Sequence, residues 1–197
     1  MKVYSYVVEH DTGYAPNPYF DFCTLCRCKF RGSATGRKNI VELANEGDWV
    51  VGTGGAGRKS ADHGKLVYAM RVDKKLTRQD YFNDTRFARK KPTKMATSTY
   101  EQTRGDNEEP RRKFEKQQFA LISQHFYYFG AYAKDIPRNF DHLEKKGSGF
   151  RCDFDSAYIR RFVEWLQENY RAGRQGDPCY REPVEKPKGG KRCKSSY

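Results

Sequence analysis

Five short stretches of the chain carry the apolar and aromatic residues that are typical of β-strands. They cover residues 3–9, 48–52, 65–73, 119–123 and 126–129. Val, Ile, Tyr and Phe dominate them, and these residue types fit the half-buried surface of a sheet. Only Gln124 and His125 separate the last two stretches, so the pattern predicts that these two strands pair as a hairpin.

Three segments show the spacing of apolar residues that predicts α-helices, over residues 36–46, 77–84 and 155–173. Thr77 followed by Asp80 resembles a capping box, which would open the second helix. Asp155 or Ser156 is expected to cap the third helix, and Gly173 to end it. The apolar stripe of that helix consists of Ile159, Phe162, Val163 and Leu166.

Strands and helices do not alternate regularly along the chain, so the order of elements predicts an α+β fold. A small, mixed, partly closed β-barrel flanked by helices suits this order. After Pro178 the composition changes to Lys, Pro, Gly and Ser. We therefore expect a single domain over residues 1–178 and a flexible basic tail over residues 179–197.

Composition narrows the class of protein. The chain has 197 residues, of which 15% are aromatic, and this share argues against global disorder. No apolar run approaches the roughly 20 residues that span a bilayer, and the N-terminus does not resemble a secretory signal. We therefore expect a cytoplasmic protein with no membrane partner and with reduced cysteines.

A formal net charge of +13 indicates a polyanionic partner, of which nucleic acid is the commonest. The alternative is a basic surface that only keeps the protein in solution. Aromatic residues are interleaved with Lys and Arg near residues 81–94, as in grooves that hold unstacked bases. The expected phosphate contacts there are Arg86, Lys90, Lys91 and Lys94, unless they form a merely solvated face.

The loop after the first predicted strand combines several chemical groups within eight positions. It contains His10, Asp11, Tyr14 and Asn17, which supply an imidazole, a carboxylate, a phenol and an amide. Function concentrates in loops that rigid strands hold in place. The alternative is a Pro-rich turn in which Asp11 and Asn17 bond to the local backbone.

Cys23, Cys26 and Cys28 form a CxxCxC motif, but the other cysteines stand alone in the sequence. A structural zinc ion needs four ligands, usually in two pairs, so buried thiols are the simpler interpretation and we expect no metal and no cofactor. A nucleophilic Cys23 assisted by His10 remains open.

Residues 47–55 join a helix to a strand and a glycine-rich loop. Glycine lets the backbone approach a ligand closely, so groups near Thr53 and Gly54 are candidates for base contacts. Trp49 could stack on a base or belong to the core. Tyr128 lies in the aromatic run FYYF, where some rings face the inside of a strand.

Five segments together resemble the nucleotide modification associated domain 2 family. They are HDTGYAPNPYFDFCTLCRCK, EGDWVVGTGG, KLVYAMRV, YFNDTRF and ALISQHFYYFG. The resemblance runs over residues 3–178 and implies an association with bacterial and phage systems that modify DNA bases. It does not imply one particular chemistry.

The chain is also similar, more weakly, to barrels of the PUA, ASCH and EVE kind. Such domains hold RNA or a flipped modified base in the cleft of a small barrel. This similarity implies a pocket formed by His10, Asp11, Tyr14, Asn17, Cys23, Trp49, Thr53 and Tyr128.

Three hypotheses follow. The first is a module that binds a nucleotide or a modified, flipped base in nucleic acid, with DNA favoured over RNA. Its base-binding residues would be Tyr14, Asn17, Trp49, Thr53, Gly54 and Tyr128. The second is an enzyme that hydrolyses a modified nucleotide or transfers a group, with His10, Asp11 and Cys23 as catalytic residues. The third is a subunit that binds a protein partner.

Overall fold

The structure is a computed structural model, and it describes residues 1–9, 11–26, 30–31, 38–55, 62–90 and 118–179. Its strands are β1 (Val3–Val8), β2 (Cys23–Leu25), β3 (Phe30–Arg31), β4 (Lys38–Asn39), β5 (Trp49–Gly54), β6 (Leu66–Arg71), β7 (Lys74–Thr77), β8 (Phe119–Ser123), β9 (Phe126–Tyr128), β10 (Phe150–Arg151) and β11 (Gly173–Arg174). Its α-helices are α1 (Ile40–Leu43), α2 (Arg78–Asn83) and α4 (Ser156–Asn169), and its 3₁₀ helices are η1 (Thr85–Lys90), η2 (Gly130–Tyr132) and η3 (Arg138–Leu143).

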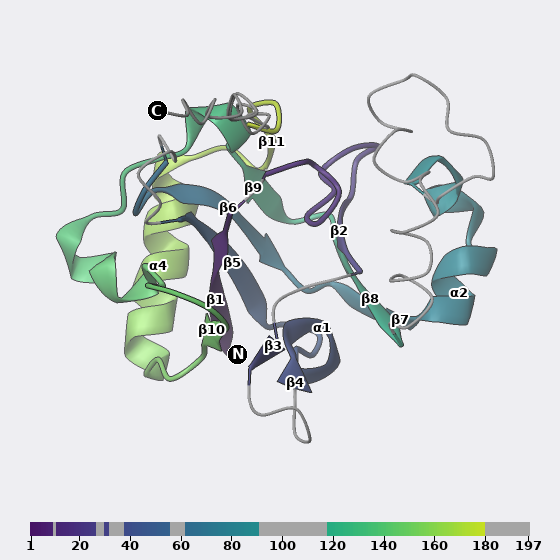
Figure 1. Cartoon of the computed structure of the whole chain (residues 1–197), viewed down its shortest axis with the longest axis horizontal. Coiled ribbons are helices and arrows are strands. Elements are labelled where there is room, and N and C mark those ends of the chain that lie inside the picture. The colour runs from purple at the N-terminus through teal and green to yellow at the C-terminus, as the bar shows by residue number, and fades with distance from the viewer. Residues whose placement is uncertain (10, 27–29, 32–37, 56–61, 91–117, 180–197) are drawn as a thin grey trace, which may run out of the picture.

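A six-stranded mixed sheet forms the centre of the molecule, with the order β10-β1-β5-β6-β9-β11. A second sheet has the order β2-β8-β7, and β3 pairs with β4. In Figure 1, α4 lies on one side of the central sheet, while α1 and the second sheet lie on the other. The α+β class expected from the sequence is confirmed, and the described strands do not close into a barrel.

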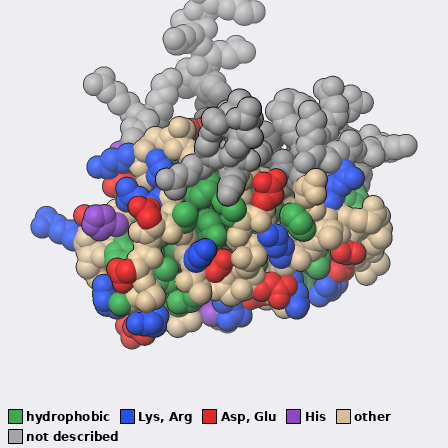
Figure 2. Space-filling model, turned by 90° about the horizontal axis from the view of Figure 1, so that it is seen from below, with side chains coloured by type: hydrophobic (Ala, Val, Ile, Leu, Met, Phe, Trp, Pro, Cys, Tyr) green, Lys and Arg blue, Asp and Glu red, His purple; other side chains and the backbone are tan. Residues whose placement is uncertain are grey.

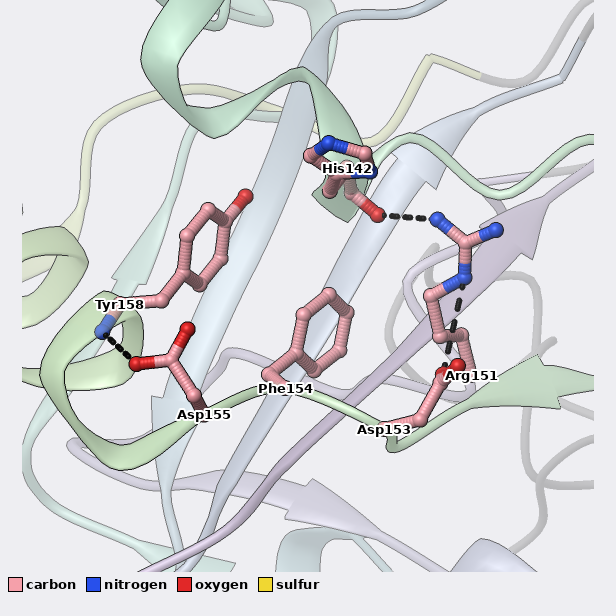
Figure 3. Close-up of a pocket in the computed structure, with 6 residues that line it drawn as sticks. All are labelled: His142, Arg151, Asp153, Phe154, Asp155 and Tyr158. Carbon is pink, nitrogen blue, oxygen red and sulfur yellow. Dashed lines mark hydrogen bonds and ion pairs between the residues drawn. The ribbon is translucent and has the colours of Figure 1, made fainter.

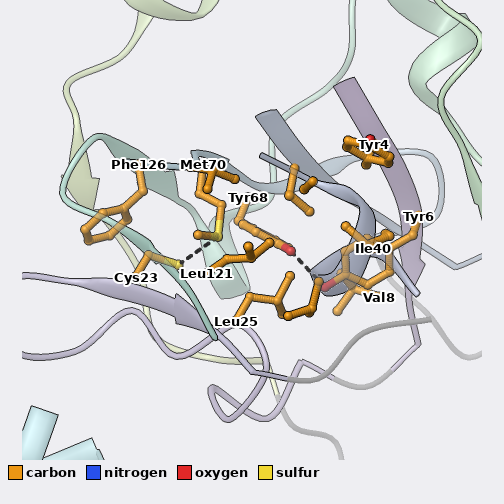
Figure 4. Close-up of a cluster of buried hydrophobic side chains, with 14 of the residues drawn as sticks. Tyr4, Tyr6, Val8, Cys23, Leu25, Ile40, Tyr68, Met70, Leu121 and Phe126 are labelled. Carbon is orange, nitrogen blue, oxygen red and sulfur yellow. Dashed lines mark hydrogen bonds between the residues drawn. The ribbon is translucent and has the colours of Figure 1, made fainter. Parts of the chain in front are cut away.

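Both faces of the central sheet are buried, which explains why its strands are almost continuously apolar. Val3 and Val51 face the α4 side, where they pack with Phe162 and Leu166. The opposite face packs against α1, β2 and β8. Figure 4 shows this second cluster, which includes Tyr4, Tyr6, Val8, Cys23, Leu25, Ile40, Tyr68, Met70, Leu121 and Phe126.

Local capping signals correctly predict where two helices begin. The Thr77 hydroxyl accepts a hydrogen bond from the Asp80 backbone N–H at 3.1 Å. The Asp155 carboxylate accepts one from the Tyr158 N–H at 2.8 Å and opens α4. The end of α4 differs from the prediction, because the helix stops at Asn169 and Gly173 lies in β11 with φ of 111°.

The helix predicted over residues 36–46 is much shorter in the structure. Lys38 and Asn39 form β4, whose ladder with β3 occupies the residues before α1. The helix then begins at Ile40, where the Asn39 side chain accepts from the Val41 N–H, and ends at Leu43. Strand pairing with β3 therefore takes precedence over local helical periodicity here.

The predicted hairpin between residues 119–123 and 126–129 is wrong, although both strands exist. β8 pairs with β7 in the second sheet, whereas β9 pairs with β6 in the central sheet. The chain bends between them at Gln124 and His125, whose N–H groups both donate to the Asp73 carboxylate, at 2.7 and 3.1 Å. Asp73 lies at the matching bend between β6 and β7, so the two strand pairs pass together from one sheet to the other.

Candidate functional site

The carboxyl ends of four strands lie along one edge of the central sheet (Figure 1). β1 and β5 are parallel neighbours, with Val8 opposite Gly54. β9 runs in the same direction, because it is antiparallel to β6, which is antiparallel to β5, and β11 is parallel to β9. The segments that follow these strands therefore leave from one edge, and such edges commonly bind ligands in α/β proteins.

The Asp11 carboxylate lies at this edge and accepts hydrogen bonds from three segments. Its side chain is buried, and the Tyr128 hydroxyl lies 2.6 Å from Oδ1 and 2.7 Å from Oδ2. The backbone N–H groups of Gly13 and Cys179 lie 3.4 Å from Oδ1 and Oδ2, respectively. We call Asp11, Gly13, Tyr128 and Cys179 the Asp11 cluster. It joins the segments after β1 and β11 to the end of β9.

The protonation state of Tyr128 follows from its surroundings. Its side chain is fully buried. Burial first, and the negative charge of Asp11 second, raise the pKa of the phenol far above its usual value. The hydroxyl therefore keeps its proton at neutral pH and serves as a donor to the carboxylate, in the type of charge-assisted hydrogen bond that is strongest in proteins.

The loop that begins with Asp11 is held at its far end by Lys90. Asn17 pairs with Thr24 through two backbone hydrogen bonds of 2.9 Å. The Lys90 ammonium donates to the Asn17 backbone oxygen at 3.0 Å, to Asn17 Oδ1 at 2.9 Å and to the Phe22 backbone oxygen at 2.8 Å. An ammonium group has three donors, so each has an acceptor in this loop.

Lys90 therefore differs from the exposed phosphate contact that the sequence predicts. The last residue of η1 turns its side chain inward, and only 6% of Lys90 is exposed. Burial lowers the pKa of its ammonium to about 8, an effect that the Asp21 carboxylate partly offsets. The hydrogen bonds of Lys90 therefore hold the loop after β1 in place.

The residues predicted to bind a base from β5 lie inside the fold. Trp49 is 1% exposed and stacks on Tyr127. Its side chain therefore belongs to the core, which is the second of the two interpretations of the sequence. Thr53 is fully buried, and its hydroxyl donates to a backbone oxygen of β1 at 3.4 Å. A Cβ on Gly54 would lie 1.7 Å from the Asp62 backbone oxygen. The sequence predicts that Gly54 lets the backbone approach a ligand. In the structure, the space beside Gly54 is occupied by the backbone of Asp62.

Tyr14 and Arg86 lie nearer the surface. Tyr14 is half-buried in the loop after β1. The side chain of Arg86 is 60% exposed, and its guanidinium bonds to the Asp84 carboxylate at 2.6 to 3.0 Å. His10, Lys91 and Lys94 lie outside the described residues, so their predicted roles stay predictions.

Cys23 is a buried thiol. Its Sγ lies 3.8 Å from Met70 Sδ, and burial raises its pKa to about 12. The thiolate is the nucleophilic form, so this setting disfavours the catalytic role considered for Cys23. No group of three or more His, Cys, Asp and Glu side chains is arranged for a metal ion within the described residues, and Cys28 lies outside them.

We expect the Cys23 thiol to make the fold sensitive to alkali. In the unfolded chain it ionises near pH ~8.5, whereas in the fold it keeps its proton up to about pH 12. Between these values the folded state binds more protons than the unfolded state. The free energy of unfolding should therefore fall with rising pH, by about 1.4 kcal/mol per unit from this thiol.

Urea unfolding of wild type and Cys23→Ala between pH 7 and 11 measures this contribution. The difference in unfolding free energy between the two proteins should change with pH at the stated rate above pH ~9. Cys152→Ala, which removes a half-buried thiol next to β10, controls for the loss of a cysteine. A difference between wild type and Cys23→Ala that is constant with pH would contradict the expected titration.

Two adjoining hollows of about 270 and 280 Å³ lie away from the Asp11 cluster. They share His142 and Arg151, and the Arg151 guanidinium donates to the His142 backbone oxygen at 2.7 Å. Phe154 and Tyr158 stack beside them with ring planes 7° apart (Figure 3). The lining mixes cations with carboxylates, and none of these residues is predicted from the sequence as a site residue.

These features define an α+β domain with a buried polar cluster at the carboxyl edge of its central sheet. The chain belongs to the nucleotide modification associated domain 2 family, whose model matches residues 1–118 and 107–185. This confirms the family expected from the sequence and puts the protein in the context of nucleotide modification. Comparisons with curated proteins and with solved structures gave no match. Within the described residues, each helix is too short or too polar to cross a bilayer.

Proposed function

We propose that this protein is a binding module that holds a modified base of nucleic acid at the carboxyl edge of its central sheet. The observation that carries the proposal is the Asp11 cluster, where the ends of β1 and β9 and the segment after β11 meet at one buried carboxylate. Preorganised donors and acceptors of this kind suit the edge of a base better than a phosphate, which would be repelled by the carboxylate.

The distribution of charge supports a polyanionic partner. The described residues contain 20 Lys and Arg against 18 Asp and Glu, which is a net charge of +2. The remaining +11 of the total of +13 belongs to residues 27–29, 32–37, 56–61, 91–117 and 180–197. On the face shown in Figure 2, basic and acidic side chains are interspersed. Non-specific attraction would thus come from these basic segments, and selectivity from the described fold.

Three of the basic segments follow residues that end a strand at the same edge of the sheet, hold the loop or belong to the Asp11 cluster. They begin after Gly55, which follows β5, after Lys90, which holds the loop, and after Cys179, which bonds to Asp11.

We further propose that the protein prefers DNA to RNA and that it binds the base after the base has flipped out of the helix. We also propose that the fold is a partly closed barrel of the PUA or EVE kind. The bends that β6–β7 and β8–β9 share between the two sheets support this interpretation.

The enzymatic alternative has less support among the described residues. Cys23 is held as a thiol, and the Tyr128 hydroxyl lies within 2.7 Å of both oxygens of the Asp11 carboxylate. These contacts suit a carboxylate that fixes the shape of a site more than one that transfers a proton to substrate.

Fluorescence anisotropy with labelled DNA and RNA 12-mers, with and without modified bases, tests the proposal. We expect affinity to fall about tenfold or more between 50 and 200 mM salt, because counterions are released from the phosphates. Asp11→Asn should weaken binding to the modified 12-mer. It should leave the salt dependence unchanged, because that dependence comes from contacts with phosphates and the base edge carries no net charge. Absence of salt-dependent binding to every DNA and RNA probe would reject the proposal, and turnover of a modified nucleotide would favour the enzyme.

A further inference from the structure

Arginines from two parts of the chain stack on the aromatic side chains of one short loop, residues 19–22. The Arg89 guanidinium carbon lies 3.7 Å from the centroid of the Phe20 ring. The corresponding distance from Arg174 to the Tyr19 ring is 4.8 Å. Arg89 belongs to η1 and Arg174 to β11, so the tertiary fold brings both to the same loop.

A third arginine extends this arrangement. The Arg86 guanidinium lies 6.0 Å from the Phe22 ring and 5.3 Å from the Phe87 ring. Cation–π contacts occur about once per 70–80 residues in proteins, so three arginines on one four-residue loop are a marked concentration. We call Arg86, Arg89 and Arg174 the arginine strip.

The loop has an unusual backbone conformation at its centre. Phe20 and Asp21 have φ of 55° and 63°, in the left-handed region that costs a non-glycine residue about 1–2 kcal/mol. The three hydrogen bonds from Lys90 to Asn17 and Phe22 hold the chain on both sides of these residues. Strain that the surroundings maintain in this way is concentrated at ligand-binding segments.

Carboxylates fix the orientation of two of the guanidinium groups. Arg86 bonds to Asp84, and Arg174 Nη1 lies 2.8 Å from Asp177 Oδ1. The side chains nevertheless remain 60% and 41% exposed. Because aspartates balance much of the local charge, the strip presents flat, fixed planes rather than a strong positive field. Guanidinium planes and aromatic rings are the surfaces on which unpaired bases stack.

The arginine strip is connected to the Asp11 cluster by a short piece of chain. Arg174 contacts Asp177, and two residues later the Cys179 N–H bonds to the Asp11 carboxylate. The loop on which the strip stacks is the continuation of the segment that begins with Asp11. A nucleic acid strand with one base at the Asp11 cluster would therefore have its neighbouring bases close to the arginine strip.

We infer that the arginine strip is a stacking surface for unpaired bases of a single-stranded nucleic acid segment that extends from the Asp11 cluster. This inference rests on the proposed function and adds that the ligand is a strand with bases free to stack, rather than a single nucleotide. Stacking of one base is worth about 1–3 kcal/mol, so loss of one stack should weaken binding about fivefold or more.

Arg89→Lys provides the test, because it keeps the charge and removes the guanidinium plane. We expect it to weaken binding of a fluorescein-labelled single-stranded DNA 12-mer about fivefold or more, with the slope of affinity against salt unchanged. Binding of deoxynucleoside monophosphates, measured by calorimetry, should not change. Arg160→Lys on the exposed surface of α4 is the matched control and should bind the 12-mer as the wild type does.

Three results would overturn the inference while leaving the proposed function intact. In the first, Arg89→Lys binds the 12-mer with the same affinity as the wild type. In the second, the wild type binds monophosphates and the 12-mer with equal affinity. In the third, the wild type binds the single-stranded 12-mer and its duplex with equal affinity. If the wild type binds no nucleic acid, the proposed function fails as well. If Arg89→Lys lowers the melting temperature, Arg86→Lys and Arg174→Lys are measured instead, and wild-type affinity in both would count against the strip.

Discussion

Tyr128→Phe is expected to lower the free energy of unfolding by about 2–3 kcal/mol, because it removes a charge-assisted hydrogen bond from a buried carboxylate. The Tyr128 hydroxyl lies within 2.7 Å of both Asp11 oxygens, and both residues are buried. The phenylalanine ring fills the same space, so packing changes little. Urea unfolding at pH 7 measures the difference.

Tyr68→Phe is the matched control for this change. Tyr68 is also fully buried, and its hydroxyl donates to the Tyr6 hydroxyl at 2.8 Å, which is a hydrogen bond between neutral groups. We expect a loss of about 1 kcal/mol there. Equal losses in the two variants would show that the charge of Asp11 contributes nothing to the bond with Tyr128.

A double-mutant cycle then connects stability to function. Asp11→Asn and Tyr128→Phe should show a coupling energy of about 1 kcal/mol or more, because the two residues interact directly. Tyr128→Phe should also weaken binding of the modified 12-mer, since the carboxylate loses the donor that orients it. Additive stability effects would contradict the direct interaction seen in the fold.

Lys90→Met is expected to lower the free energy of unfolding by about 2 kcal/mol at pH 7. The methionine keeps an unbranched side chain of similar length but leaves oxygens of Asn17 and Phe22 without their ammonium donor. The loop that carries Tyr19 and Phe20 should then relax, and affinity for single-stranded DNA should fall even though the side chain does not contact the ligand.

The effect of Lys90 should depend on pH with a definite sign. Its pKa is about 8 in the fold and about 10.4 in an unfolded chain, so between these values the unfolded state binds more protons. The contribution of Lys90 to the free energy of unfolding therefore rises with pH over this window. The gap between wild type and Lys90→Met should be wider at pH 9.5 than at pH 7.

Arg160→Met on α4 is a control for the removal of an exposed cation. A gap between wild type and Lys90→Met that stays constant from pH 7 to 9.5 would contradict the burial of the ammonium. Unchanged stability of Lys90→Met at both pH values would show that the loop is held by its other contacts.

Local signals predicted the elements of this protein well. The strands at residues 119–123 and near residues 3–9 follow from their β-branched and aromatic residues, and the caps at Thr77 and Asp155 follow from side chains that bond to N–H groups within three residues. The hairpin at Gln124 failed because strand pairing depends on partners far along the chain. The two-residue turn at that point is a bend held by Asp73.

The candidate site was predicted only in part for the same reason. Asp11 and Tyr128 were both named from the sequence, but nothing local indicated that they contact each other across 117 positions. Cys179 was assigned to a tail, yet its N–H bonds to Asp11. The tertiary fold also moved Trp49 into the core.

The sequence by itself determined the α+β class, the family and the excess of positive charge, because periodicity, motif order and composition need no knowledge of contacts. Only the tertiary structure decided which polar groups meet. It buried Lys90 beneath a loop, brought Tyr128 to Asp11 and stacked Arg174 on Tyr19. These contacts depend on the register and direction of strands that lie far apart in the chain, and that register is set by the packing of the whole core.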